Sequence, residues 1–290
     1  MTRRHCLHVC FLTAAGKVAS ATDAASLPAA LPDLQPANGR IRIASYNILG
    51  GRNPDGKRDL SRVATVLRLL NPDIVALQEV DAGTRRIQGR NLPEELGKLT
   101  GWKQRFGEAM PFEGGSYGVA VLTKHGIAAA VNHLLPARKG SEPRAALEVE
   151  CVLPGDRRFT FIGTHLDHQN DETDRLQQVR KLRELFTAAT LKSPGVLAGD
   201  LNAPLETAAL TELTAFWQPS TPPDAAPPTF PATGPKDRID HILLQPNAGW
   251  KVLRNACGTA IFPGNAAWQA ALVAASDHLP ILAEVELTKP

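Results

Sequence analysis

The sequence predicts an α/β (α+β) protein in which β-sheets pack together and helices cover their outer faces. β-prone segments recur from residue 41 to residue 287, few helical segments separate them, and no internal repeat is present. Of the 290 residues, 43% are apolar and 21% are charged, as in ordinary globular proteins. This length allows one large core or two smaller ones, and we expect a single domain over residues 40–290.

The first part of the domain is predicted to run strand, helix, strand. Residues 41–47 alternate and are β-prone, and residues 73–78 form a short apolar run. Between them, apolar residues recur at helical spacing: Leu60, Val63, Ala64, Leu67 and Leu70. Further strands are expected at 117–122, 144–152 and 158–165.

The second part begins with a longer helix, expected over residues 172–189. Apolar residues form a stripe among its charges: Leu176, Val179, Leu182 and Phe186. The remaining elements are expected to be a strand at 195–199, a helix near 205–215 and strands around 239–244, 250–256 and 280–287. The stretch from Pro219 to Pro235 contains seven prolines, which makes it irregular.

The N-terminal segment 1–21 has the features of a secretory signal peptide. Positive charge precedes an apolar stretch from Cys6 to Ala15, and Ala19-Ser20-Ala21 offers a small-residue cleavage site. Residues 22–39, rich in Ala, Pro and Asp, are expected to be a linker. No later stretch approaches the roughly 20 apolar residues of a membrane span, so we expect no transmembrane segment. The protein is then secreted or periplasmic; a disordered leader on a cytoplasmic protein is the alternative.

The formal charge of +3 belongs to this same leader. Residues 1–21 contain Arg3, Arg4 and Lys17 and no acidic residue, so the rest of the chain is formally neutral. Bulk electrostatics therefore gives no support for a nucleic-acid partner, although a local basic patch stays open.

Four cysteines are present, and Cys6 and Cys10 lie in the leader. The other two, Cys151 and Cys257, are far apart in the sequence and form no metal-ligand or redox spacing. We expect them to be buried or to form one disulfide rather than to be catalytic.

Polar residues suited to catalysis or metal binding stand at the ends of predicted strands. They are Asn47 in SYNILGG, Glu79 in IVALQEVD, His165 and Asp167 in FIGTHLDH, Asp200 and Asn202 in VLAGDLN, Asp240 in DRIDHILL, and Asp277 and His278 in SDHLP. Side chains that project from the same end of several strands can converge on one point. Each motif alone is more often explained by a turn or a helix cap and would not support a function. Their order, each after a β-prone run, favours one shared site.

These motifs together resemble those of the endonuclease/exonuclease/phosphatase superfamily. That superfamily includes deoxyribonuclease I, exonuclease III, neutral sphingomyelinases and inositol polyphosphate 5-phosphatases. The resemblance covers about Ile41 to Leu287, and it is specific as a set and weak motif by motif. It implies a four-layer α/β sandwich, with two packed mixed β-sheets flanked by helices and the site at one end.

The resemblance also implies how metal and water are held. Glu79 would be the main metal ligand, helped by Asn47 and Asp277. Asp200 would orient or deprotonate the attacking water, and Asn202 would hydrogen-bond the phosphoryl oxygens.

For the transition state, the resemblance points to histidines and one arginine. His278 would stabilise or protonate the pentavalent state, with Asp240 fixing its ring. His165 matches the Thr-His histidine of the deoxyribonuclease I and sphingomyelinase branches, a candidate acid for the leaving oxygen. Arg144, in EPRAALEV, corresponds to an arginine that contacts phosphate. Many relatives have Tyr-Gly-Asn where this chain has Tyr117-Gly118-Val119, which removes a side-chain amide there.

The chemistry of the residues agrees with these implied roles independently. Several carboxylates in one pocket raise each other's pKa unless a cation compensates them. Few carboxylates plus substrate oxygens suit Mg²⁺ or Mn²⁺. Zinc is the second choice, because no His-x-x-x-His pair supports it. A G-x-S-x-G nucleophile motif is absent, so direct attack by water is expected.

Several further residues have two interpretations each. Asp167 and His168 either line the pocket or end a strand, whereas His241 should point away from Asp240 and be structural. Three arginines after Glu79 either lie in a solvated loop or grip substrate phosphates: Arg85, Arg86 and Arg90. Two aromatic residues are expected in the loop before Asp277, as buried packing or as a stacking rim: Phe262 and Trp268.

The sequence thus predicts a divalent-metal-dependent phosphoester hydrolase, of phosphodiesterase or endonuclease type and acting as a monomer. A phosphomonoesterase and a phospholipid phosphodiesterase are alternatives on the same fold. A catalytically inactive binding protein is the alternative of another class, and it predicts loss of a key site residue. All five that matter most are present: Glu79, Asp200, Asn202, Asp277 and His278.

Overall fold

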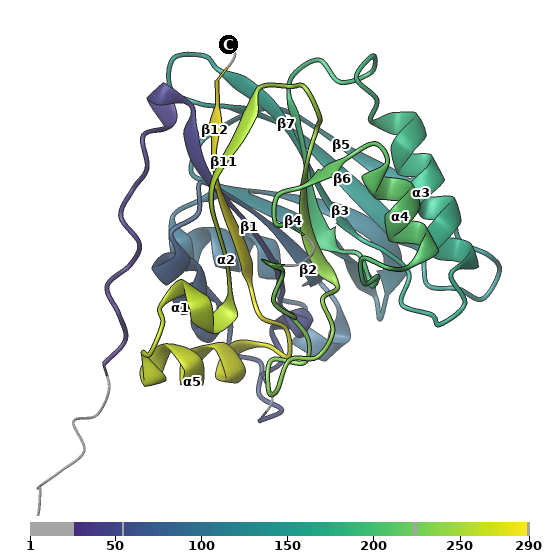
Figure 1. Ribbon diagram of the computed structural model, residues 1–290. Helices are drawn as coiled ribbons and strands as arrows, with labels where there is room; N and C mark the ends of the chain where they lie inside the picture. Colours follow the sequence, from purple (N-terminus) through teal and green to yellow (C-terminus); the bar gives the residue numbers. More distant parts are fainter. Residues whose placement is uncertain (1–25, 54, 223–224, 289–290) are drawn as a thin grey trace, which may run out of the picture.

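The computed structural model describes residues 26–53, 55–222 and 225–288 (Figure 1). The predicted signal segment 1–21, the first four residues of the predicted linker, and Cys6 and Cys10 lie outside these residues. Within the described part, two six-stranded mixed sheets pack against each other and helices cover their outer faces. The predicted four-layer sandwich is therefore confirmed.

The first sheet pairs the N-terminal and C-terminal strands of the domain. Its members are β1 (Arg40–Asn47), β2 (Ile74–Ala82), β3 (Lys103–Phe112), β4 (Gly115–Thr123), β11 (Trp250–Cys257) and β12 (Ile281–Leu287). Their order across the sheet is β11-β12-β1-β2-β4-β3. Only β1 and β2 run parallel to each other among these described strands, so the carboxyl ends of these two lie at the same edge.

The second sheet comes from the middle of the chain. Its members are β5 (Gly126–Leu135), β6 (Arg144–Val152), β7 (Arg158–His165), β8 (Gly195–Asp200), β9 (Gln218–Pro219) and β10 (Asp240–Leu244). They are ordered β5-β6-β7-β8-β10-β9, with β7 and β8 parallel. Each sheet thus has one central parallel pair, flanked by antiparallel strands.

The helices divide between the two outer faces (Figure 1). The first face carries α1 (Leu60–Leu70), α2 (Leu92–Thr100) and α5 (Ala266–Ala275), and the second carries α3 (Thr173–Leu185) and α4 (Ala208–Thr214). Short 3-10 helices lie at Pro36–Asn38, Leu49–Gly51, Arg85–Ile87 and Gly258–Ile261. No helix among the described residues is long and apolar enough to cross a membrane.

Apolar side chains fill both the space between the sheets and the space under the helices. One cluster joins Leu67 of α1 to Ile43 of β1 and to Phe161 of β7. A second joins Leu182 of α3 to Leu197 of β8. Full burial of one such side chain contributes about 1.5–3 kcal/mol to the stability of the fold. These clusters therefore stabilise the packing of the four layers.

Five elements were not expected from the sequence: α2, α5, β3, β5 and β9. Helix α5 has a single polar residue, Gln269, and therefore lacks the polar and apolar alternation that marks a surface helix. The expectation that Trp268 lies in a loop is wrong: it is fully buried within α5, and Phe262 packs on it edge to face. Strand β5 is an exposed, alanine-rich edge strand, and alanine favours strands weakly.

Two further expectations concern the cysteines and the predicted linker. Cys151 and Cys257 are buried and unpaired with each other, and burial raises the pKa of each thiol to about 12. Residues 26–39 lie along the domain: the Leu31 amide donates to the carbonyl of Leu69, and the carbonyl of Leu31 accepts from Asn71.

Candidate active site

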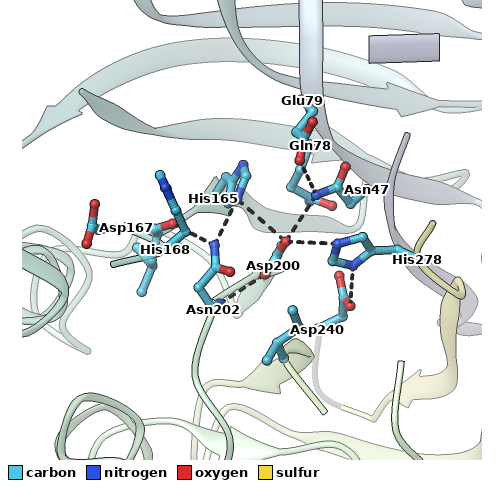
Figure 2. A network of polar contacts seen from close by, with 12 residues as sticks. Asn47, Gln78, Glu79, His165, Asp167, His168, Asp200, Asn202, Asp240 and His278 are labelled. Atoms are coloured by element: carbon cyan, nitrogen blue, oxygen red, sulfur yellow. Dashed lines mark hydrogen bonds and ion pairs between the residues drawn. The ribbon is translucent and has the colours of Figure 1, made fainter. Parts of the chain in front are cut away.

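The topology brings the polar strand ends to one place. Asn47 ends β1, His165 ends β7 and Asp200 ends β8, which are members of the two parallel pairs. Strand β10 runs antiparallel to β8, so its first residue, Asp240, lies opposite Asp200. His278 precedes β12, which is antiparallel to β1 and therefore starts where β1 ends. Residues from both sheets consequently surround Asp200 (Figure 2).

Close approach of two strands explains the glycine before Asp200. A Cβ atom on Gly199 would lie 2.1 Å from the carbonyl oxygen of Thr164, far below any allowed contact. Glycine therefore lets β7 and β8 approach with His165 in register with Asp200. Nε2 of His165 lies 3.5 Å from Oδ2 of Asp200.

A β-bulge aims Glu79 into the site. Between Leu77 and Val80 the pairing of β2 with β4 shifts register, and Glu79 adopts a left-handed backbone conformation with φ of 56°. Non-glycine residues rarely adopt this conformation, and bulges recur beside active sites where they redirect a side chain. Asn202 has φ of 49°, so the residue that follows β8 is also in this strained region.

Asn47 links the carboxylates of the two sheets. Its side-chain nitrogen donates to Oε1 of Glu79 and to Oδ2 of Asp200, each at 3.0 Å. Because an amide group carries no charge, this bridge does not compensate the two negative charges. Burial raises the pKa of Glu79, and the nearby carboxylate of Asp277 raises it further.

A cavity of about 400 Å³ opens beside these groups. The predicted site residues that line it are Glu79, Arg144, His165, His168, Asp200, Asn202, Asp277 and His278. Asp240 lies behind His278, fully buried. Asp167 is also fully buried and is not part of the lining; it accepts the backbone N–H of Gln169. Sequence reasoning missed six further lining residues: Met110, Phe112, Tyr117, Glu142, Phe230 and Ile239.

Asp200, Asp240 and His278 form one charge-compensated group. His278 Nδ1 lies 3.0 Å from Asp240 Oδ2, and its Nε2 lies 3.7 Å from Asp200 Oδ2. Burial alone would lower the pKa of His278, but the negative charge of Asp240 and its hydrogen bond raise this pKa to about 10. Burial, and then the charge of Asp240, raise the pKa of Asp200 to about 7. His278 is thus an imidazolium at neutral pH.

Arg144 makes the other two histidines hydrogen-bond acceptors. Its terminal nitrogens lie 3.0 Å from Nδ1 of His165 and 3.0 Å from Nδ1 of His168, and Glu142 Oε1 is 3.0 Å from Nη1. A guanidinium has only donors, so both Nδ1 atoms accept. Burial and the charge of Arg144 hold the pKa of His165 well below its usual value. His165 is therefore neutral, and its Nε2 lies 3.0 Å from the side-chain nitrogen of Asn202.

Two groups of carboxylates are candidates to hold a cation. Asp200, Asp240 and His278 each place a ligand atom within 4.8 Å of the others, and Oδ1 of Asp240 has no partner among the described residues. This group could bind a metal. The second group is Glu79 with Asp277, whose negative charges face the cavity without a cationic partner as close as His278 is to Asp240. Carboxylate oxygens fit a hard divalent cation. The amide oxygen of Asn47 accepts the backbone N–H of Leu49 at 3.0 Å.

His241 and the loop arginines take separate places. His241 is fully buried and its Nε2 donates to the carbonyl of Ala203 at 2.9 Å, the structural use that was expected. Of the three arginines after Glu79, Arg86 lines the cavity, Arg90 pairs with Glu95, and Arg85 is exposed.

The family model of the endonuclease/exonuclease/phosphatase family matches residues 44–278. The chain belongs to this family. It is therefore a phosphoric ester hydrolase. No curated protein matches the chain in sequence.

Solved structures of family members share the fold. A family protein from Beutenbergia cavernae is 23% identical, has a TM-score of 0.66, and the match covers 86% of this chain and 72% of that one. A mannosyl-6-phosphatase from Bacteroides thetaiotaomicron is 17% identical with a TM-score of 0.62, covering 84% and 99%. The human Nocturnin catalytic domain is 18% identical with a TM-score of 0.64, covering 86% and 94%.

Proposed function

We propose that this enzyme is a divalent-metal-dependent phosphoester hydrolase of the phosphodiesterase type, in which Asp200 activates water. The position of Asp200 carries the proposal. This carboxylate faces the cavity between His165, Asn47 and His278, and its pKa is raised to about 7. A general base works best when its pKa is near the working pH.

Glu79 is the main metal ligand in this proposal, with Asn47 and Asp277 beside it. A cation there would relieve the repulsion between Glu79 and Asp277. It would neutralise charge on the phosphoryl oxygens when bound. The Asp200, Asp240 and His278 group is less suited, because a protonated imidazole has no lone pair to offer a metal. Carboxylate and amide oxygens favour Mg²⁺ or Mn²⁺ over zinc.

The proton transfers follow from the positions of the side chains. Asp200 accepts a proton from water as the water oxygen attacks phosphorus, and the bond to the leaving oxygen breaks. His278, held by Asp240, donates a hydrogen bond to the phosphoryl oxygen that gains charge. Asn202 lies at the cavity beside it.

Two groups face the leaving group. His165 lines the cavity with its Nε2 3.5 Å from Oδ2 of Asp200, and in this proposal it faces the leaving oxygen. Arg144 contributes positive charge from behind the His165 and His168 rings.

The test is hydrolysis with Mg²⁺ or Mn²⁺ of bis-p-nitrophenyl phosphate, plasmid DNA, RNA, sphingomyelin and inositol phosphates. We expect Asp200→Ala to lower kcat by on the order of 10² to 10⁴, because a positioned base contributes this much. Asp237→Ala is the matched control, since Asp237 is exposed. Equal metal-dependent rates in the wild type and Asp200→Ala would refute the proposal.

A phosphomonoesterase is the second candidate. The cavity of about 400 Å³ is the size of a small-molecule site, and the mannosyl-6-phosphatase has the same fold. Faster turnover of p-nitrophenyl phosphate than of bis-p-nitrophenyl phosphate would favour this candidate.

A further inference from the structure

Arg86 is a second cationic residue at the active-site cavity, on the opposite sheet from Arg144. It belongs to the short 3-10 helix Arg85–Ile87 that follows β2, whereas Arg144 begins β6 of the second sheet. Both line the same cavity. The catalytic steps above make no use of Arg86.

The side chain of Arg86 is held in place by an ion pair. Its Nε lies 3.1 Å and 3.0 Å from the two carboxylate oxygens of Asp81, which is fully buried. Thr84 donates to the same carboxylate. Asp81 follows Glu79 by two residues on β2, and Glu79 and Arg86 line the same cavity. Arg86 is thus anchored close to the proposed metal ligand.

Two aromatic rings pack against the guanidinium of Arg86. Its central carbon lies 4.7 Å from the ring centre of Phe112 and 5.4 Å from that of Tyr117. Tyr117 is directly opposite Asp81 on β2 and opposite Met110 on β3, so all three side chains lie on one face of the sheet. An arginine fixed by a carboxylate and by ring stacking loses little further conformational entropy when it binds a ligand.

The terminal nitrogens of Arg86 remain available. Neither Nη1 nor Nη2 has a hydrogen-bond partner among the described residues, and the side chain is 30% exposed. Gly50 leaves room beside them: a Cβ there would be 3.6 Å from Nη2 of Arg86 and 2.9 Å from Asp81. Two parallel N–H donors match the oxygens of a carboxylate or a phosphate.

Arg144 differs, because its terminal nitrogens already contact His165, His168 and Glu142. It serves the reacting end of the cavity. The two terminal nitrogens of Arg86, in contrast, contact none of the catalytic side chains named above.

We propose that Arg86 forms a second anion subsite, so that the substrate is a small phosphoester that carries a second anionic group, a phosphate or a carboxylate. The reacting end of this substrate rests on the proposed function. The organic part that joins the two anionic groups lies along Met110 and Phe112, which form the cavity wall beside Arg86. The cavity of about 400 Å³ accommodates such a compact molecule.

Binding measurements test the subsite without requiring turnover. Calorimetry on the full chain with excess Mg²⁺ compares three ligands: glycerol 3-phosphate has one anionic group, 3-phosphoglycerate adds a carboxylate, and 2,3-bisphosphoglycerate adds a second phosphate. In the wild type we expect at least one of the two bis-anionic ligands to bind on the order of ten-fold more tightly than glycerol 3-phosphate, as one charge-assisted pair predicts. Which one does so identifies the second group.

The variants assign that difference to Arg86. In Arg86→Gln the ratio of dissociation constants should fall to within about two-fold, whereas Arg85→Gln, at an exposed neighbour, should keep the wild-type ratio. Arg86→Lys keeps a charge near Asp81 if the glutamine variant fails to fold, and it should give an intermediate ratio because it lacks the forked donors.

Three outcomes separate the subsite from the proposed function. An unchanged ratio in both Arg86 variants, or no preference for a bis-anionic ligand in the wild type, overturns the subsite. An Arg86-dependent ratio in a protein that hydrolyses no phosphoester supports the subsite and overturns the proposed function. Hydrolysis of bis-p-nitrophenyl phosphate without an Arg86-dependent ratio supports the proposed function and overturns the subsite.

Discussion

The two halves of the active site handle negative charge in different ways. On one side, Asp200 and Asp240 share the imidazolium of His278, which lies 3.0 Å from Asp240 and 3.7 Å from Asp200. On the other side, Glu79 has only the neutral amide of Asn47 as a hydrogen-bond partner among the described residues, and Asp277 adds a second negative charge. The first half contains its own cation, whereas no cationic side chain pairs directly with Glu79 among the described residues.

This difference assigns chemistry to each half. A carboxylate whose charge is partly balanced, with a pKa near neutrality, is suited to taking and releasing protons. The Glu79 and Asp277 pair, on which His278 and Arg144 act only from a distance, is suited to a divalent cation. Asn47 contacts both halves and holds the proposed base, Asp200, next to the proposed metal ligand, Glu79.

The largest expected effect is the loss of activity on substitution of Glu79, in the half of the site where no cationic side chain pairs with the carboxylates. Glu79→Gln keeps the size of the side chain and removes its charge, so metal-dependent kcat should fall on the order of 10³-fold, equivalent to several kcal/mol of lost charge stabilisation. The metal-free variant should be at least as stable as the wild type, because a buried carboxylate with a raised pKa is absent.

Metal titration by calorimetry and thermal melting of the metal-free proteins check both statements. Glu94→Gln, an exposed glutamate on α2, is the control. If Glu79→Gln binds the metal as tightly as the wild type, then Asp200 and Asp240 bind the cation instead.

The second prediction concerns the compensated half. The negative charge of Asp240 raises the pKa of both Asp200 and His278. In Asp240→Asn both pKa values should therefore fall, and the acidic and basic limbs of the profile of kcat/KM against pH should both move to lower pH. Activity at neutral pH should drop about 10- to 100-fold, as for other lost partners of functional side chains. A profile with limbs that stay in place would show that Asp240 only packs behind the ring.

The sequence predicts the strand-end residues well for a physical reason. Each of Asn47, His165 and Asp200 follows a short buried strand, and the parallel pairs put these strand ends at one edge of the molecule. The overall architecture could be predicted from the same strands together with the family resemblance.

Features that depend on pairing between distant strands could not be predicted. The bulge that turns Glu79 into the cavity arises only when β2 pairs with β4. Phe112 was missed because β3 carries charges, Gly107 and Pro111, which obscure the alternation of a strand. The choice of Arg86 among three arginines depends on where the buried carboxylate of Asp81 lies, and the sequence does not show burial.

The last prediction concerns stability rather than catalysis, on the face of β10 that points away from the site. Asp240 stabilises a charged histidine, whereas its neighbour His241 is kept neutral: burial lowers the pKa of His241 from 6.5 to about 4. Because the unfolded chain binds this proton more readily, the stabilising contribution of the neutral ring is fully present above pH 6.5 and is lost as pH falls toward 4. The loss amounts to up to about 3 kcal/mol for a group this deeply buried.

His241→Gln should therefore show a smaller decrease in the free energy of unfolding between pH 7 and pH 4.5 than the wild type. Glutamine can still donate to the carbonyl of Ala203 but binds no proton. Urea unfolding at the two pH values measures the difference, with His133→Gln on the edge strand β5 as the control. An equal decrease in wild type and His241→Gln would mean that His241 does not titrate on unfolding, and that only the charged face of β10 responds to acid.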